Sequence, residues 1–143
     1  MDLDTIDQKL LAMLRVNSRA STSALARDLG ISRSTVQDRI RRLEKRRIIA
    51  GYTVRYHSDY GGRLLNAHVM IQVNPKRTSA VTTALETIGA IRTLQSVSGV
   101  YDMVALVEAA STEEMDKVLD QIGELPGVEK TATSVVLSTK FER

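Results

Sequence analysis

The side chains with the clearest chemistry lie in one short stretch, residues 33–47. Arginine, glutamine and serine can donate to or accept from the edges of DNA bases in the major groove. Four residues of the stretch suit such contacts: Arg33, Ser34, Gln37 and Arg41. Its other basic residues suit phosphates, whose contacts set register and give salt-dependent affinity: Arg39, Arg42, Lys45, Arg46 and Arg47. The stretch indicates a DNA-binding element, with a merely solvated basic face as the alternative.

A helix must position these side chains, and the pattern predicts one. Val36, Ile40 and Leu43 recur at helical spacing. Ser32 stands where an N-cap belongs, and Ile31 and Val36 occupy the two positions of a hydrophobic staple. The opposite face is polar: Ser34, Asp38, Arg41 and Lys45, flanked by Gln37 and Arg42. One face would pack into a core while the other meets DNA.

Two shorter helical segments precede this helix. Apolar residues recur at helical spacing between positions 6 and 14. Asp4, with Asp7 three residues later, suits the start of this helix, because carboxylates accept from free amides there. The next segment ends at Gly30, where glycine can adopt a left-handed backbone. A tight turn between two such helices is a helix-turn-helix signature. The predicted DNA-binding set also contains Asp38 and the residues that begin the second segment: Ser21, Thr22 and Ser23.

Charge divides the chain into two parts. Residues 1–55 hold 12 Lys and Arg against 6 Asp and Glu, whereas residues 56–143 hold 8 against 11, within a net charge of +3. Such asymmetry suggests that one half meets a polyanion. Cysteine is absent, which excludes disulfides and thiolate metal sites. No apolar run approaches the roughly 20 residues that span a bilayer, and no export signal is visible, so we expect a soluble, cytoplasmic protein.

A connecting region follows the basic half. Tyr52, Val54 and Tyr56 alternate with polar residues, which predicts a strand that would form a short wing or connector. The polar, glycine-bearing residues 58–62 suggest a hinge. The expected organisation is a DNA-binding domain at 1–55, a linker at 56–63 and a second domain at 64–143.

The acidic half shows two strand–helix–strand units. Its strands are expected at 65–73, 91–97, 102–108 and 130–139, and its helices around 81–88 and 111–122. Ser111 and Glu114 form a capping box before the second of these helices. This order is the ferredoxin-like βαββαβ arrangement. The fold class is therefore α+β, with an N-terminal winged helix-turn-helix domain joined to a ferredoxin-like domain.

The predicted sheet has apolar residues on both faces. The runs 103–107 and 135–137 are apolar throughout. Two helices can cover only one face, so the other needs a second layer. A second copy packed sheet to sheet supplies it and would pair two DNA-reading helices. We expect a homodimer, with cover by a local loop as the alternative.

Seven short stretches, each weak alone, occur in a specific order and spacing: residues 3–7, 17–21, 25–32, 39–44, 49–52, 98–102 and 125–128. Through them the chain resembles the Lrp/AsnC (feast/famine) transcription regulators nearly from end to end. The resemblance implies an N-terminal DNA-binding domain, a C-terminal ligand-sensing domain and dimers that join into octamer-like rings. It also implies an amino acid as the effector.

The resemblance places the effector site in two stretches. The turn at 98–102 matches the family's effector-responsive loop, and part of the last strand matches a second one: Ser98, Gly99, Val100, Tyr101 and Asp102, then Thr133, Ser134 and Val135. Glycine lets backbone amides approach a carboxylate, Asp102 could hold an ammonium group, and Thr133 or Ser134 could add hydroxyl contacts. The alternative is that the turn only joins two strands.

Two residues depart from the family pattern. Arg47 stands where a glycine usually ends the third helix, and Val100 stands where a polar residue is frequent. The similar architecture of sirohaem decarboxylase subunits makes an enzyme the main rival, but His57 and His68 are the only histidines, and no catalytic or metal-spaced set is visible. We therefore expect no enzyme, metal or cofactor. A DNA-architectural protein without a ligand is the second rival.

Overall fold

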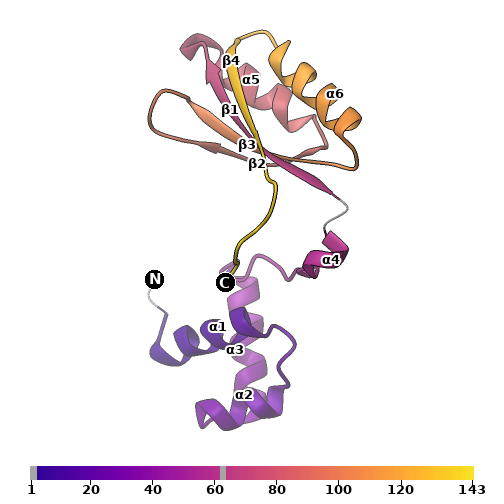
Figure 1. The fold of residues 1–143 in the computed structure, drawn as a ribbon. Helices are drawn as coiled ribbons and strands as arrows, with labels where there is room; N and C mark the ends of the chain where they lie inside the picture. Colours follow the sequence, from indigo (N-terminus) through magenta and orange to yellow (C-terminus); the bar gives the residue numbers. More distant parts are fainter. Residues whose placement is uncertain (1–2, 62–63) are drawn as a thin grey trace. The chain divides into compact units, whose positions relative to one another are not determined.

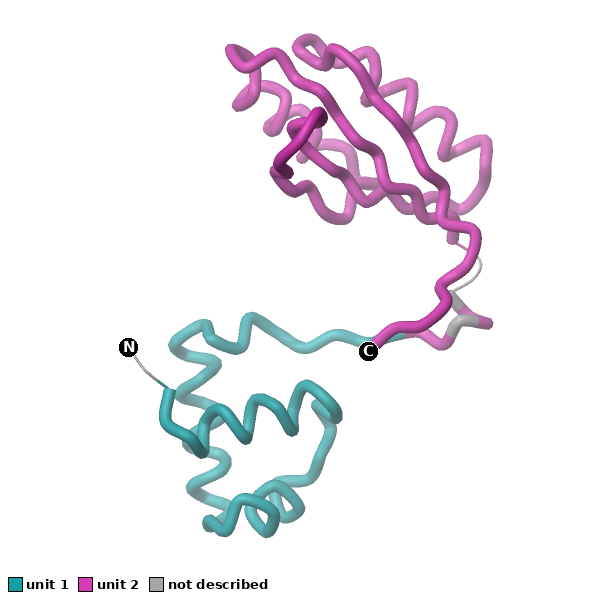
Figure 2. Tube along the Cα trace, turned by 60° about the vertical axis from the view of Figure 1, so that its left-hand side comes forward, with its two compact units in different colours: residues 1–55 teal, residues 56–143 magenta. Residues whose placement is uncertain are grey.

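The computed structural model describes residues 3–61 and 64–143 (Figure 1). The chain divides into two compact units, residues 1–55 and 56–143 (Figure 2). We call them unit 1 and unit 2 and describe each by itself.

Unit 1 contains three helices, each with a side-chain cap. They are α1 (Thr5–Val16), α2 (Thr22–Leu29) and α3 (Arg33–Lys45). Asp4, Ser21 and Ser32 each accept a hydrogen bond from the backbone N–H three residues later. These bonds satisfy amides that a helix start would otherwise leave free. The predicted helix starts are confirmed.

The core of unit 1 lies between the three helices. Its buried apolar residues come from all of them: Leu10, Leu14, Leu25, Ala26, Val36 and Leu43. Val36 and Leu43 are fully buried, as the helical spacing of α3 predicts.

The helices α2 and α3 end in the same backbone motif. At the end of α2, Gly30 has φ +68° and the N–H of Ile31 donates to the carbonyl of Ala26 at 3.1 Å. At the end of α3, Arg47 has φ +54° and the N–H of Ile48 donates to the carbonyl of Leu43 at 2.9 Å. This is the Schellman motif, whose left-handed position favours glycine. Arg47 therefore carries backbone strain that Gly30 does not.

The segment after α3 contradicts the predicted wing. Residues 46–57 contain no strand. Tyr52, Val54 and Tyr56 are exposed by 55%, 73% and 68%. Alternation alone does not make a strand, because a strand needs a partner for its backbone groups, and the described residues of unit 1 offer none.

The expected linker is partly helical. Ser58–Gly61 form the short helix α4, and the rings of Tyr56 and Tyr60 lie 5.2 Å apart. Gly62 and Arg63 of the predicted linker lie outside the described residues.

Unit 2 has the expected βαββαβ order and one four-stranded antiparallel sheet. Its elements are β1 (Leu65–Val73), the 3-10 turn η1 (Pro75–Arg77), α5 (Thr78–Glu86), β2 (Ile91–Ser96), β3 (Met103–Ala109), α6 (Thr112–Gly123) and β4 (Val128–Val135). The strand order β2-β3-β1-β4 puts β1 and β3 in the middle. Both helices lie on one side of the sheet (Figure 1).

The last strand is shorter than predicted. β4 ends at Val135 rather than at Thr139, and residues 136–143 have no regular structure. Val135 pairs with Ala67, and the N–H of Val136 donates to the carbonyl of Asn66. Since β1 begins at Leu65, the chain soon runs out of backbone partners.

The two faces of the sheet differ in cover. On the helix side, Ala67, Val69 and Ile71 of β1 are at most 1% exposed. Half-buried or exposed residues occupy the other side, which we call the open face: Asn66, His68, Met70, Gln72, Val104, Leu106, Ala132 and Ser134. The expectation of apolar residues on both faces of β3 is confirmed, because Val104 and Leu106 point away from the helix side.

Candidate nucleic-acid interface and ligand site

The exposed face of α3 gathers most of the predicted DNA-reading side chains. Arg33, Ser34, Gln37, Asp38 and Arg41 are all exposed. The guanidinium of Arg41 lies 3.7 Å from the carboxylate of Asp38, and both side chains are about three-quarters exposed. Such an exposed pair contributes little to stability, so both groups are available to a ligand.

Hydroxyl groups surround the starts of α2 and α3. Ser32 Oγ lies 3.1 Å from Ser34 Oγ and 2.7 Å from Thr35 Oγ1. At the start of α2, Ser21 is used as the cap, Ser23 is exposed and Thr22 is half-buried. Free amides and the helix dipole at such positions favour anions.

Arg39 does not lie where the sequence analysis placed it. Its Nη1 donates to Asp4 Oδ2 at 2.7 Å and to Asp7 Oδ1 at 2.8 Å, and its side chain is only 18% exposed. The hydrogen bonds to Asp4 and Asp7 raise the pKa of Arg39 above its usual value. Its expected role as a phosphate contact is wrong, because its charge is used within unit 1.

Arg42 shares the same acidic partner. Its Nη2 donates to Asp7 Oδ2 at 3.0 Å and to Asp7 Oδ1 at 3.2 Å, while half of its side chain is exposed. Asp7 itself is 2% exposed. The Asp7 backbone N–H and then the Arg39 side chain lower the pKa of Asp4 below its usual value.

Sequence reasoning missed this network, whose members lie 32 to 35 positions apart. One signal existed: Asp4 and Asp7 are three residues apart, and so are Arg39 and Arg42. That spacing puts each pair on one side of its helix.

The remaining basic candidates lie at the end of α3. Lys45 and Arg47 are exposed, and Arg46 is half-buried at the helix cap. The left-handed backbone at Arg47 closes the helix here without glycine.

The predicted effector turn joins β2 to β3. Gly99 has φ +112°, a conformation that favours glycine, and Val100 is exposed. The Asp102 N–H donates to the carbonyl of Ile71 at 2.9 Å, and Asp102 Oδ2 accepts from the N–H of Val73 at 2.7 Å. One carboxylate oxygen of Asp102 therefore holds β1, a structural role that sequence reasoning did not foresee.

The second predicted stretch lies on the opposite side of β1. Ser134 pairs with His68 on the open face, and Thr133 pairs with Val69 on the helix side. Asp102 lies beside Ile71, three residues along β1 from His68, which is about 10 Å. Within the described part of unit 2, the two stretches do not meet in one pocket.

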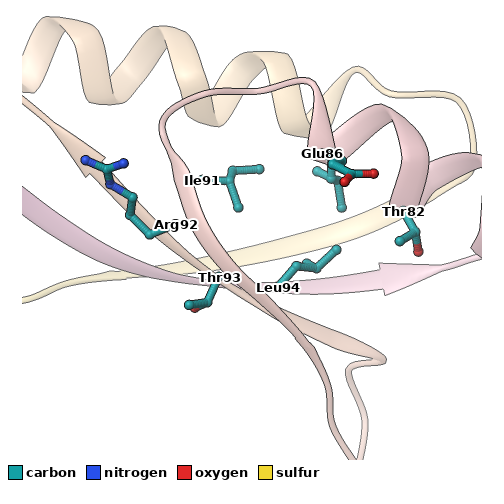
Figure 3. A pocket seen from close by; sticks show the side chains of 7 residues that line it. Thr82, Glu86, Ile91, Arg92, Thr93 and Leu94 are labelled. Atoms are coloured by element: carbon teal, nitrogen blue, oxygen red, sulfur yellow. The ribbon is translucent and has the colours of Figure 1, made fainter. Parts of the chain in front are cut away.

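A cavity of about 340 Å³ lies elsewhere, between α5 and β2 (Figure 3). Its lining includes Leu85, Ile91 and Leu94 but none of the predicted effector residues. Arg92 points away from Glu86 in Figure 3 and donates to Glu108 at 2.7 Å. The described residues contain no cluster that could hold a metal ion. No helix within residues 3–61 and 64–143 is long and apolar enough to span a membrane.

Two family models match the chain and cover most of it. Residues 3–44 match the AsnC-type helix-turn-helix domain, and residues 66–143 match the Lrp/AsnC ligand binding domain. The boundary between the two matches falls in the region that separates α3 from β1.

Curated relatives align along nearly the whole chain. The HTH-type transcriptional regulator LrpA of Mycobacterium tuberculosis is 36% identical over 140 residues, which cover 97% of this chain and 93% of that protein. The HTH-type transcriptional regulator FL11 of Pyrococcus horikoshii is 31% identical over 140 residues, with 98% and 93% covered.

Solved structures share the same architecture. A feast or famine regulatory protein from M. tuberculosis in complex with L-methionine superposes with a TM-score of 0.87 at 34% identity, covering 99% of this chain and 96% of that one. Escherichia coli AsnC gives a TM-score of 0.87 at 21% identity, with 100% and 97% covered, which shows the shared fold alone.

Proposed function

The chain belongs to the Lrp/AsnC family of DNA-binding transcriptional regulators, and from this we propose that an amino-acid-like effector controls it by binding at interfaces of unit 2. We assign DNA binding to residues 1–55, a linker to 56–63, and effector binding and assembly to 64–143. The L-methionine complex of a 34% identical relative supports the effector class. The curated relatives described above are regulators, and we propose that this chain is likewise no enzyme and acts in the cytoplasm.

The single observation that carries the DNA-binding assignment is the two-sided character of α3. Val36 and Leu43 anchor one side in the core, while the other side is polar and exposed. In a helix-turn-helix such a helix lies in the major groove. We assign base edges to Arg33, Ser34, Gln37 and Arg41, with Asp38 beside them. We assign phosphate contacts to six residues and a shared role to a seventh: Ser21, Thr22, Ser23, Lys45, Arg46 and Arg47, with Arg42 shared between Asp7 and DNA.

The open face supports assembly of unit 2. Met70, Val104 and Leu106 form an apolar centre there that no described element of unit 2 covers. A second copy packed face to face would bury it under a two-fold axis. We propose a homodimer that assembles further, toward an octamer.

The effector site would then draw on more than one copy. In one chain, the turn at 98–102 and the stretch 133–135 lie on different sides of β1. The amides around Gly99 suit a carboxylate, and the second oxygen of Asp102 suits an ammonium group. We propose that a neighbouring copy completes the pocket with Ser98, Val100, Tyr101, Thr133, Ser134 and Val135.

DNA binding is tested with the full-length protein and labelled duplexes in a gel-retardation assay. We expect retardation that weakens steeply as salt rises, because counterions are released from phosphates. Absence of any retarded complex even in dilute buffer would refute the assignment.

Effector binding is tested by measuring the melting temperature with each of the twenty amino acids. We expect at least one to raise it and to change affinity for a retarded duplex. Asp102→Asn keeps an acceptor for the Val73 N–H but loses the charge, so the response should be lost. Asp116→Asn, on the exposed side of α6, is the charge-matched control. No response to any amino acid would favour a regulator without this ligand class.

A further inference from the structure

We propose that Asp7 competes with a DNA phosphate for Arg42, so that one buried carboxylate limits how much charge the recognition helix offers to DNA. This inference rests on the proposed role of α3 in DNA binding. It assigns Asp7, which is buried on α1 behind Arg42, a function as a positioning residue for affinity.

The geometry makes Arg42 a group with two possible partners. Its Nη2 lies within 3.2 Å of both oxygens of Asp7, yet half of the side chain faces solvent. Carboxylate and phosphate oxygens are both strong acceptors for a guanidinium. A phosphate that approaches the exposed side of α3 can therefore take the same donors that Asp7 holds.

Because Arg39 also pairs with Asp7, Arg42 can leave without making the buried carboxylate an unpaired charge. Arg39 donates to Asp7 Oδ1 at 2.8 Å, and its own side chain is 18% exposed, against 50% for Arg42. Its Nη1 also donates to Asp4 Oδ2 at 2.7 Å, so two carboxylates hold the Arg39 side chain inward. A buried carboxylate left alone would be strongly destabilising. With Arg39 in place, Asp7 stays paired in either arrangement.

The competition lowers affinity for every sequence by a similar factor. Phosphate contacts carry no base information. When Asp7 retains Arg42, binding to any DNA loses one phosphate contact, while the contacts assigned from Gln37 and Arg41 to base edges are unaffected. Binding weakens for all sequences alike, so base contacts supply a larger share of the binding free energy at the preferred sequence.

The test compares Asp7→Asn with wild type on a non-operator duplex over a range of salt concentrations. Freeing Arg42 should raise affinity several-fold in dilute buffer and steepen the log–log salt slope by as much as about 0.9, the value for one added phosphate contact. Arg42→Gln should remove this gain in the Asp7→Asn background and have a smaller effect in wild type. A purely structural role for Asp7 predicts that Asp7→Asn lowers affinity, whereas competition predicts a gain that disappears when Arg42 is also replaced.

Asp28→Asn is the matched control, since it removes one negative charge from unit 1 at an exposed carboxylate that has no ion pair among the described residues. Circular dichroism confirms that each variant is folded. Should Asp7→Asn not fold, Arg42→Gln is compared with Lys45→Gln in the wild-type background. Competition predicts a clearly smaller loss of affinity for Arg42→Gln, because Lys45 has no described carboxylate partner.

The outcomes separate the two ideas. If wild type retards no duplex, the proposed function itself fails. If wild type binds but Asp7→Asn behaves like Asp28→Asn, or Arg42→Gln loses as much as Lys45→Gln, the competition is refuted and DNA binding stands.

Discussion

Unit 1 and unit 2 bury their apolar surface in different ways. In unit 1 each helix has one apolar side, and those sides meet in a shared core that includes Leu10, Leu25 and Leu43. In unit 2 the central strand β3 is apolar on both sides, and α5 and α6 cover only one of them. The sheet therefore keeps Val104 and Leu106 half-buried on its open face.

This difference predicts where substitutions act. A unit that covers its own apolar surface leaves its polar surface free for a ligand, here the exposed face of α3. A unit with an uncovered apolar face directs that face toward another protein layer. Changes in unit 1 should alter DNA binding or local stability, whereas changes on the open face should alter assembly.

The largest expected effect is on assembly. Leu106→Lys would place a charge without a partner at the centre of the face-to-face interface in both copies. We expect the dimer to weaken by roughly 3 kcal/mol or more, about 100-fold in Kd, with the thermal unfolding of unit 1 unchanged. Sedimentation velocity measures the Kd. Thr83→Lys on the exposed side of α5 is the control, and equal Kd values for the two variants would show that the open face is not the interface.

The next effect concerns sequence recognition in unit 1. Arg41→Ala should cost about 1–3 kcal/mol for the preferred sequence if Arg41 makes a bidentate contact to a base, because that contact is absent from non-specific DNA. Fluorescence anisotropy on preferred and scrambled duplexes gives the ratio. Arg46→Ala should instead weaken both duplexes alike. A ratio that Arg41→Ala leaves unchanged would remove Arg41 from base recognition.

A smaller effect should appear at the end of α3. Arg47→Gly should stabilise unit 1 by about 1 kcal/mol, since it relieves a left-handed conformation that side chains disfavour. Arg46→Gly, at φ −79°, relieves nothing and should destabilise. Urea denaturation followed by circular dichroism gives both values. Destabilisation by Arg47→Gly would mean that the arginine side chain makes a stabilising contact.

The smallest expected effect is on how the stability of unit 1 changes as the pH falls. The folded state lowers the pKa of Asp4 below 3.8 through the Asp7 N–H and Arg39. A lowered pKa gives stability that is present above the unfolded value and is lost as the pH falls through the folded value. Asp4→Asn retains a helix-capping side chain but should reduce the loss of melting temperature between neutral pH and about pH 3. Identical pH profiles would contradict an ionic contribution from Asp4.

Local features could be predicted from the sequence because their partners are close in the chain. Ser21, Ser32 and Ser111 each accept from an amide three residues away, so a short window contains both partners. The order of strands and helices likewise restricted the sheet to few topologies. The exposed polar face of α3 followed from helical period alone.

Features with distant partners could not be predicted in this way. The alternation around Tyr52 predicted a strand, but nothing local shows whether another strand lies beside it. The second role of Asp102 depends on the N–H of Val73, 29 residues away. The inward orientation of the Arg39 side chain likewise depends on Asp4 and Asp7, and a helical wheel of α3 alone cannot reveal it.

The four tyrosines of this tryptophan-free chain have an uneven distribution. Tyr52, Tyr56 and Tyr60 lie between α3 and β1, where the rings of Tyr56 and Tyr60 are neighbours. The fourth, Tyr101, lies in the turn assigned to the effector. Tyrosine fluorescence from the unlabelled protein therefore comes from only two places, the connecting segment and the turn. An optical titration can follow both without adding a dye.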